Sequence, residues 1–324
     1  MSTTTLSRAL NSGLRHILED DPKALVMGQD IGGLGGVFRV TDGLQKDFGS
    51  ARVIDTPLAE SGIVGTAIGL AIRGYRPVCE IQFDGFVYPA FNQIVSQLAK
   101  IRSRSRGSIS LPIVIRIPVG GGIGAVEHHS ESNEAYFAHT AGLRVVYCSN
   151  PNDAHWMLRQ AAAGNDPTIF YEPKRQYWTK GDVGEAGRAY PLDKARTVRP
   201  GSDLTLLGYG GTVETCLRAA EVSVADGRDI EVIDLRSLSP FDIETVAASV
   251  QRTGRCVVVH EAPTFVGFGA EIGTAVTERC FHHLEAPVLR VGGFDMPYPP
   301  AKFETEFLPG LDRVLDTVDR SFAW

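Results

Sequence analysis

The stretch ESGIVGTAIGLAIRGYRPVCEIQ, residues 60–82, places an apolar helix directly before a buried strand. Residues 61–73 have a helical apolar pattern closed by Gly74, and RPVCEIQ has the short apolar run of a strand. Three glycines recur within the helix at small-residue spacing: Gly62, Gly65 and Gly69. Because glycine lowers helix propensity, we expect this helix to pack closely against another backbone. Helices that alternate with such strands are typical of a parallel sheet covered on both faces.

The same alternation of helices and strands continues through both halves of the chain. In the first half, we expect helices over residues 6–18, 88–101 and 152–163 and strands over residues 24–30, 51–55, 111–118, 143–148 and 168–173. Residues 174–191 are polar and glycine-rich, which is typical of a linker, and a second series runs from residue 203 to a C-terminal helix ending near residue 322. The sequence therefore predicts an α/β fold of two doubly wound domains, over residues 1–180 and 190–324.

The composition is that of an ordinary globular protein. The 324 residues are 43% hydrophobic and 22% charged, and the net charge of -6 argues against a nucleic-acid-binding protein. We expect neither a signal peptide nor a membrane span, because no segment approaches the ~20 consecutive apolar residues that a span needs. The five cysteines are scattered and form no CxxC pair, so we expect buried, reduced thiols and a cytoplasmic location.

The histidine loop AVEHHSESNEAYFAHT, residues 125–140, is a candidate for metal binding or for acid/base chemistry. His128 and His129 are adjacent, so their side chains diverge, and neither HExxH spacing nor a cysteine pair accompanies them. A metal site is therefore not expected. An imidazole titrates near neutral pH, which suits acid/base work, and a plain polar loop between two buried strands is the alternative.

Two further segments place chemically active residues at the ends of strands. Glu60 opens the apolar helix, either as a first-turn carboxylate that favours the helix dipole or as a partly buried carboxyl with a raised pKa. The segment QFDGFVYPAF, residues 82–91, supplies aromatic rings for the core or for a flat ligand. Ligands of such sheets bind beyond the carboxyl ends of the strands. One crevice can therefore receive Glu60, the aromatic segment and the histidine loop.

Six stretches occur in order along nearly the whole chain: DTPLAESGIVG, RPVCEIQFDGFVYPAFNQI, EHHSESNEAYFAHTAGLRVV, DPTIFYEPK, VIDLRSLSPFD and APVLRVGGFDMPYP. With these stretches, the chain resembles the β subunit of the thiamine-diphosphate-dependent 2-oxo acid dehydrogenases. The resemblance implies a transketolase-like pyrimidine-binding domain followed by a transketolase C-terminal-like domain. Within the family, EIQFDGFVYPAF and HHSES look closest to branched-chain 2-oxo acid dehydrogenases of bacterial type.

The resemblance implies roles for single positions. Glu60 matches the glutamate that hydrogen-bonds the aminopyrimidine ring nitrogen of thiamine diphosphate, and Phe86 matches the aromatic residue that stacks on that ring. Leu58 and Gln82 match positions that line the cofactor and substrate pocket. His129 matches the histidine of the family's His-Ser-Gln motif, which is expected to act on the substrate or the lipoyl group during acyl transfer.

The chain also departs from the family pattern. Glu131 replaces the glutamine of the His-Ser-Gln motif, and we expect it either to raise the pKa of His129 or to change how the loop meets a partner. Thiamine-diphosphate enzymes hold the diphosphate and Mg²⁺ with a Gly-Asp-Gly motif, which this sequence lacks. The resemblance therefore implies that an α subunit supplies the diphosphate half of the site and holds the Mg²⁺. Relatives also bind K⁺, and the segment AGNDP leaves open whether this chain does.

The resemblance implies an activity and partners as well. We expect an α2β2 heterotetramer that decarboxylates branched-chain 2-oxo acids and passes the acyl group to the lipoyl arm of an acyltransferase core. The resemblance also implies that the second domain makes subunit contacts and docks that core. Pyruvate or acetoin is the alternative substrate, because pocket residues of the α subunit also decide which side chain fits. The alternative to an enzyme subunit is a non-catalytic scaffold subunit. That alternative predicts that replacing Glu60 or His129 leaves activity intact.

Overall fold

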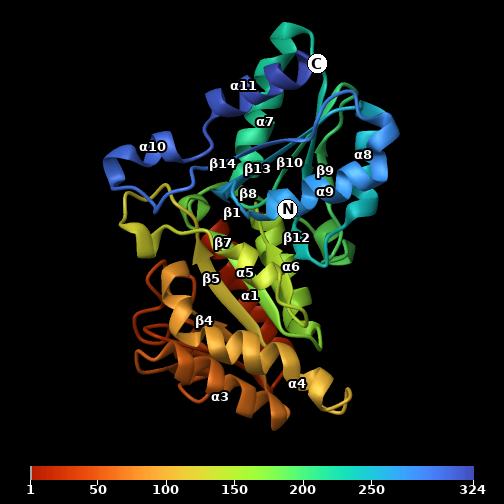
Figure 1. Ribbon diagram of the computed structural model, residues 1–324. Coiled ribbons are helices and arrows are strands. Elements are labelled where there is room, and N and C mark those ends of the chain that lie inside the picture. The colour runs from red at the N-terminus through yellow and green to blue at the C-terminus, as the bar shows by residue number, and fades with distance from the viewer. Residues whose placement is uncertain (1) are drawn as a thin grey trace.

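Two large β-sheets, one centred on each half of the chain, organise the fold in the computed structural model, which describes residues 2–324 (Figure 1). The first sheet has the strand order β12-β6-β7-β5-β4-β2-β3. Its strands are β2 (Ala24–Gly28), β3 (Val53–Asp55), β4 (Arg76–Glu80), β5 (Val114–Val119), β6 (Arg144–Tyr147), β7 (Thr168–Pro173) and β12 (Ser237–Ser239). Neighbouring strands are parallel except β12, which pairs antiparallel with β6. Because β12 comes after the predicted linker, the second half of the chain completes the first sheet.

The second sheet has the strand order β14-β13-β10-β11-β9. Its strands are β9 (Arg196–Arg199), β10 (Leu204–Gly208), β11 (Ile230–Asp234), β13 (Cys256–Pro263) and β14 (Leu289–Gly293). It is parallel apart from β9, which pairs antiparallel with β11 at one edge. A small third sheet pairs β1 (Ser2–Thr5) with β8 (Lys180–Val183). Part of the predicted linker is therefore a strand that pairs with the N-terminal segment.

Helices pack around these sheets, and local sequence sets several of their ends (Figure 1). The α-helices are α1 (Leu6–Asp20), α2 (Leu44–Phe48), α3 (Glu60–Ile72), α4 (Ala99–Arg104), α5 (Glu134–Ala138), α6 (Pro151–Ala163), α7 (Thr212–Ser223), α8 (Ile243–Thr253), α9 (Phe268–Cys280), α10 (Glu304–Phe307) and α11 (Leu311–Phe322). Short 3-10 segments are η1 (Asp84–Ala90), η3 (Glu127–His129), η4 (Lys174–Gln176), η5 (Glu185–Ala189), η6 (Val224–Asp226), η7 (Phe281–His283) and η8 (Ala301–Phe303), and η2 (Asn92–Leu98) is a π-helix. At the start of α6, the Asn150 side chain accepts from the backbone N–H of Asp153 at 2.9 Å, and Pro151 occupies the first turn.

One sequence expectation about helices is wrong, and a second is not met within the described part of this chain. The helix expected over residues 88–101 is instead divided among η1, η2 and α4. Pro89 lies within η1 and has no backbone N–H, so it interrupts the regular hydrogen-bond ladder there. No second backbone segment of the described chain packs against Gly65 or Gly69 of α3. A Cβ at Gly65 or Gly69 would meet no atom within 4 Å among residues 2–324, because the packed face of α3 carries the larger apolar residues instead.

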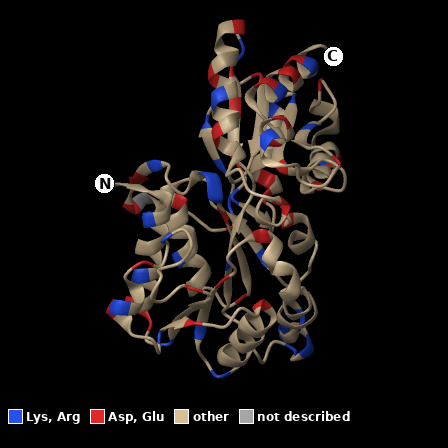
Figure 2. Ribbon diagram, turned by 90° about the vertical axis from the view of Figure 1, so that its left-hand side faces the viewer, with Lys and Arg blue, Asp and Glu red and all other residues tan. Residues whose placement is uncertain are grey.

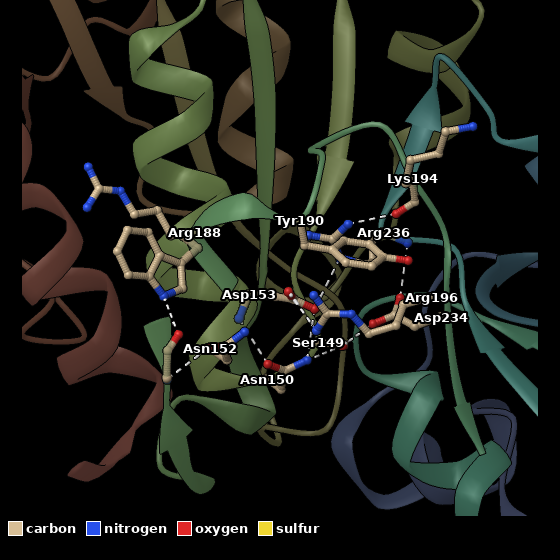
Figure 3. Close-up of polar contacts among 12 residues, drawn as sticks. Ser149, Asn150, Asn152, Asp153, Arg188, Tyr190, Lys194, Arg196, Asp234 and Arg236 are labelled. Carbon is tan, nitrogen blue, oxygen red and sulfur yellow. Dashed lines mark hydrogen bonds and ion pairs between the residues drawn. The ribbon is translucent and has the colours of Figure 1, made fainter. Parts of the chain in front are cut away.

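Buried charges connect the two halves of the chain at their junction (Figure 3). Asp153 on α6 lies 3.2 Å from Arg236 Nε and 3.3 Å from Arg196 Nη1. The Tyr190 ring lies 4.7 and 4.2 Å from the same two guanidinium groups. Burial, reinforced by the negative charge of Asp153, raises the pKa of Asp234 to about 7. These contacts link α6 of the first half to β9, to the turn between β11 and β12, and to the segment between the sheets.

The surface carries charges of both signs. Acidic and basic residues are interspersed over both halves of the molecule (Figure 2). Among residues 2–324, no helix combines the length and the apolar character that crossing a membrane requires. The cysteines are buried free thiols, as expected from the sequence.

Candidate functional site

Strands β4, β2 and β3 are parallel neighbours, so their carboxyl ends lie at one edge of the first sheet. Strand β3 ends at Asp55, and the chain enters α3 at Glu60, which is half-buried. Strand β4 ends at Glu80 and leads through Gln82 into η1, which carries Phe86. Helix α3 packs against η1. The sheet topology therefore brings Glu60 and the aromatic segment to the same edge, where ligands of such sheets bind.

The aromatic segment meets the histidine loop at this edge. The centroid of the His129 ring lies 4.4 Å from that of Phe83 and 5.1 Å from that of Phe86, edge to face in both pairs. The His128 ring stacks on Phe86 with 5.9 Å between centroids. The expected convergence of these two segments is therefore observed, and His129 lies between rings that are themselves only partly buried.

His129 is the titratable group at the centre of this cluster. Its Nδ1 atom is buried and makes no hydrogen bond to any residue among 2–324. Burial lowers the pKa of His129, and the charges of His128 and Lys174 lower it further. The imidazole is therefore neutral at neutral pH. The expectation that Glu131 raises this pKa is wrong, because the Glu131 carboxylate instead accepts a 2.5 Å hydrogen bond from the Tyr88 hydroxyl.

A buried ion pair lies beneath the aromatic rings. Lys174 Nζ donates to Asp84 at 3.0 Å, and both side chains are fully buried. Asp84 also accepts from the backbone N–H groups of Gly85 and Gly120, at 3.1 and 3.2 Å. The ammonium lies 5.4 Å from the centre of the Phe83 ring. Burial raises the pKa of Asp84 to about 7 and lowers the pKa of Lys174, as expected when the charged form of each group loses its water.

A second buried ion cluster crosses the sheet behind the site. The Arg116 guanidinium donates to Glu172 at 2.6 and 2.9 Å and to Glu80 at 2.7 Å. The Tyr177 hydroxyl donates to the same Glu172 carboxylate at 2.6 Å. These contacts link β7, β5 and β4, which are neighbours in the sheet. They therefore hold the end of β4, from which the aromatic segment begins.

The structure places every predicted site residue near this edge but does not bring all of them into contact. Phe86 and His129 touch. Gln82 Nε2 donates instead to Asp30 at 3.1 Å, on the loop after β2. Leu58 is 71% exposed and lies at the entrance to α3. Across the described chain, no group of three or more His, Cys, Asp and Glu side chains is arranged to hold a metal ion.

Sequence reasoning missed the buried charges behind the site. Arg116 interrupts the apolar run LPIVIRIP, and a charge inside a buried strand signals a buried partner, so this signal was available. Asp84 and Lys174 gave a weaker signal, because each begins a short 3-10 segment that follows a strand, outside the apolar run of the strand itself. Their pairing depends on the path of the chain between them.

Comparison with known proteins connects this geometry to a family. Residues 2–179 match the family model described as the transketolase pyrimidine binding domain, and residues 193–314 match the transketolase C-terminal domain. The pyruvate dehydrogenase E1 component subunit beta of Leifsonia xyli is 59% identical over 98% of this chain and 94% of its own length. The chain belongs to the family of 2-oxo acid dehydrogenase β subunits.

Other 2-oxo acid dehydrogenase β subunits differ in the substrate for which they are named. The 3-methyl-2-oxobutanoate dehydrogenase subunit beta of Mycobacterium tuberculosis is 53% identical over 98% of this chain and 91% of its own length. The 2-oxoisovalerate dehydrogenase subunit beta of Pseudomonas aeruginosa is 47% identical over 97% of this chain and 93% of its own. A solved split gene transketolase, an inactive beta4 tetramer, has a TM-score of 0.81 at 21% identity over 98% of both chains, which shows the fold alone. The family and the fold class predicted from the sequence are confirmed.

Proposed function

We propose that this β subunit forms the pyrimidine half of a thiamine diphosphate site, which it shares with an α subunit in an α2β2 heterotetramer. The proposal rests on the contact between the Phe86 and His129 rings, whose centroids lie 5.1 Å apart. This contact lies at the edge of the sheet where Glu60 begins α3. A partly buried aromatic ring, a carboxyl group and an imidazole nitrogen without a partner suit a flat heterocycle and its proton transfers. Mg²⁺ prefers carboxylate and phosphate oxygens, and residues 2–324 hold no such cluster, so the α subunit is the proposed holder of the metal.

Each predicted residue has its own task in this proposal. Thiamine diphosphate supplies the carbon nucleophile and the electron sink when it is bound. Glu60 holds a proton at the pyrimidine ring nitrogen, and Phe86 offers its ring face to the same heterocycle. Leu58, which is 71% exposed, contributes apolar surface to the pocket, and Gln82 contributes an amide.

His129 moves protons during acyl transfer. Its lowered pKa keeps the ring neutral at neutral pH. During this transfer one lipoyl sulfur accepts the acyl group, the S–S bond breaks, and the other sulfur leaves as a thiolate. A neutral imidazole can take up a proton at one ring nitrogen and donate from the other, so His129 can protonate that thiolate without being left charged. The second domain then serves subunit contacts and docking of the lipoyl-bearing acyltransferase core, as the family resemblance implies.

We further propose a branched-chain 2-oxo acid, with 3-methyl-2-oxobutanoate as the example, as the preferred substrate. The segments EIQFDGFVYPAF and HHSES support it by resemblance, and the relative named for 3-methyl-2-oxobutanoate is 53% identical. Pyruvate is the second candidate, because the relative named for pyruvate dehydrogenase is 59% identical. The substrate side chain also meets the α subunit, so a direct measurement must decide between the two acids.

The test is an assay of the complex that is purified through a tag on this chain. It measures carbon dioxide release from 3-methyl-2-oxobutanoate or pyruvate, and acyl transfer to lipoamide from acetoin, which has no carboxylate to lose. We expect thiamine-diphosphate-dependent turnover of the branched acid and a loss of about 10²-fold or more in Glu60→Gln. Glu271→Gln is the matched control, because Glu271 also lies in the first turn of a helix, α9, but is exposed. Full activity of Glu60→Gln in an intact complex would contradict the site assignment and favour a scaffold subunit. Turnover of pyruvate or acetoin alone would contradict only the substrate assignment.

A further inference from the structure

We propose that Glu304, in the second domain, is a positioning residue that holds the histidine loop where His129 can act. This inference rests on the proposed function of His129 and adds a contact from the other domain to it. Glu304 is the first residue of α10, and its side chain is buried. It contacts the glycine segment GGGIG, residues 120–124, which leads directly into the histidine loop.

The backbone N–H groups of the glycine segment are directed at carboxylates. Gly122 donates to Glu304 Oε1 at 2.8 Å, and Gly124 donates to Glu304 Oε2 at 3.0 Å. Gly121 donates to Glu261 Oε2 at 3.1 Å. Both carboxylates belong to the second domain, so three hydrogen bonds to that domain order the segment that leads into the histidine loop. Hydrogen bonds to an ionised acceptor are roughly twice as strong as neutral ones, which makes these contacts effective.

The glycine segment cannot hold its shape alone, whereas the carboxylates are themselves fixed. Gly122 and Gly124 have φ values of 86° and 70°, and glycine loses more conformational freedom on ordering than any other residue. The Tyr298 hydroxyl donates to Glu304 Oε1 at 2.5 Å. Glu261 lies 2.9 Å from the Arg175 guanidinium. Other side chains therefore hold both acceptors in place, Tyr298 of the second domain for Glu304 and Arg175 of the first domain for Glu261.

The histidine loop has room to leave the position that these contacts impose. A cavity of about 190 Å³ lies between Ser130 of the loop and the second-domain residues Met296 and Tyr298. Ser130 directly follows His129, so a shift of the loop into this cavity would displace the imidazole from its position beside Phe83 and Phe86. Loss of the Glu304 contacts should therefore lower the rate of the step that needs His129 without disturbing the pyrimidine half of the site.

Hydrogen exchange measured by mass spectrometry on the full chain in its complex tests the contact itself. In Glu304→Ala, peptides covering residues 120–131 should exchange about ten-fold faster or more, because two charge-assisted bonds are lost. Glu304→Gln keeps one acceptor oxygen and should show an intermediate rate. Glu306→Gln is the matched control, because Glu306 lies on the same helix but is exposed. An unchanged exchange rate in folded Glu304→Ala would overturn the inference.

Kinetics on the same complexes separate this inference from the proposed function of His129. We expect Glu304→Gln to lower kcat for acyl transfer to lipoamide about ten-fold, with KM for the 2-oxo acid and the affinity for thiamine diphosphate unchanged. His129→Ala should abolish acyl transfer while residues 120–124 exchange as in the wild type. Full acyl transfer by His129→Ala would refute the role of His129 itself. Wild-type kcat in Glu304→Gln, alongside an inactive His129→Ala, would refute the positioning role alone.

Discussion

Removing one partner of the buried pair between Asp84 and Lys174 should destabilise the protein far more than removing both. In Lys174→Met, the Asp84 carboxylate still accepts hydrogen bonds from the backbone N–H groups of Gly85 and Gly120, but it loses the ammonium group that lies 3.0 Å away. Breaking a buried ion pair leaves an uncompensated charge, so we expect the free energy of unfolding to fall by about 3–5 kcal/mol. Asp84→Asn should cost a similar amount, because it leaves the ammonium buried without its partner.

The double variant Asp84→Asn/Lys174→Met carries no buried charge at this position. Replacing a buried ion pair by neutral groups is often close to neutral, so its stability should lie within about 2 kcal/mol of wild type, with a coupling energy of about 3 kcal/mol or more. Urea unfolding followed by far-UV circular dichroism, at one protein concentration, measures all four proteins. A coupling energy below about 0.5 kcal/mol would refute the reasoning, because the two charges would then be stabilised independently.

The pH dependence of Lys174→Met provides a second check on the same pair. Burial raises the pKa of Asp84 to about 7, and the charge of Lys174 opposes that rise. Without Lys174 the pKa of Asp84 rises further, so above neutral pH the folded state binds a proton that the unfolded state has lost. Relative to wild type, the stability of Lys174→Met should therefore fall by up to about 1.4 kcal/mol per pH unit as the pH rises through this range. A stability difference that stays constant between about pH 6 and about pH 9 would contradict this account.

Three further changes test other parts of the structure. Arg116→Met leaves two buried carboxylates without their cation, so the free energy of unfolding measured with urea should fall by about 3–5 kcal/mol. Arg102→Met, at an exposed ion pair, is the control and should lower it by under about 1 kcal/mol. Equal losses in the two variants would contradict the argument that burial makes the first ion pair costly to break. Burial raises the pKa of Asp234 to about 7, so the folded state binds a proton that the unfolded state has lost, and this group lowers stability as the pH rises toward that value. Asp84 contributes a slope of the same sign, so Asp234→Asn should reduce the fall of the thermal midpoint with pH without removing it. A pH dependence identical to that of wild type would rule out a contribution from Asp234. His128→Gln removes a charge that lowers the pKa of His129, so the acid limb of the pH profile for acyl transfer should move to higher pH. An unmoved limb would mean that His128 does not contribute to this pKa.

The sequence alone determined the order and type of most elements, because hydrophobic periodicity and turn residues act over a few neighbouring positions. The run from Glu60 to Gln82 shows this, since an apolar helix, a terminal glycine and an apolar strand appear in the structure as α3 and β4. The candidate site was predictable to the same extent. Residues at the carboxyl ends of parallel strands meet at one edge, and the contact between Phe86 and His129 follows that rule.

The tertiary structure decided what depends on the path of the chain. No local pattern indicates that β12 joins the first sheet beside β6, or that β1 pairs with β8. The partner of Asp84 is Lys174, at the end of another strand, and the glycine segment before the histidine loop meets Glu304 of the second domain. A buried charge or backbone N–H needs a partner, but it does not specify which distant residue supplies it. The path of the chain through the tertiary structure makes that choice, because it alone sets which side chains share a buried space.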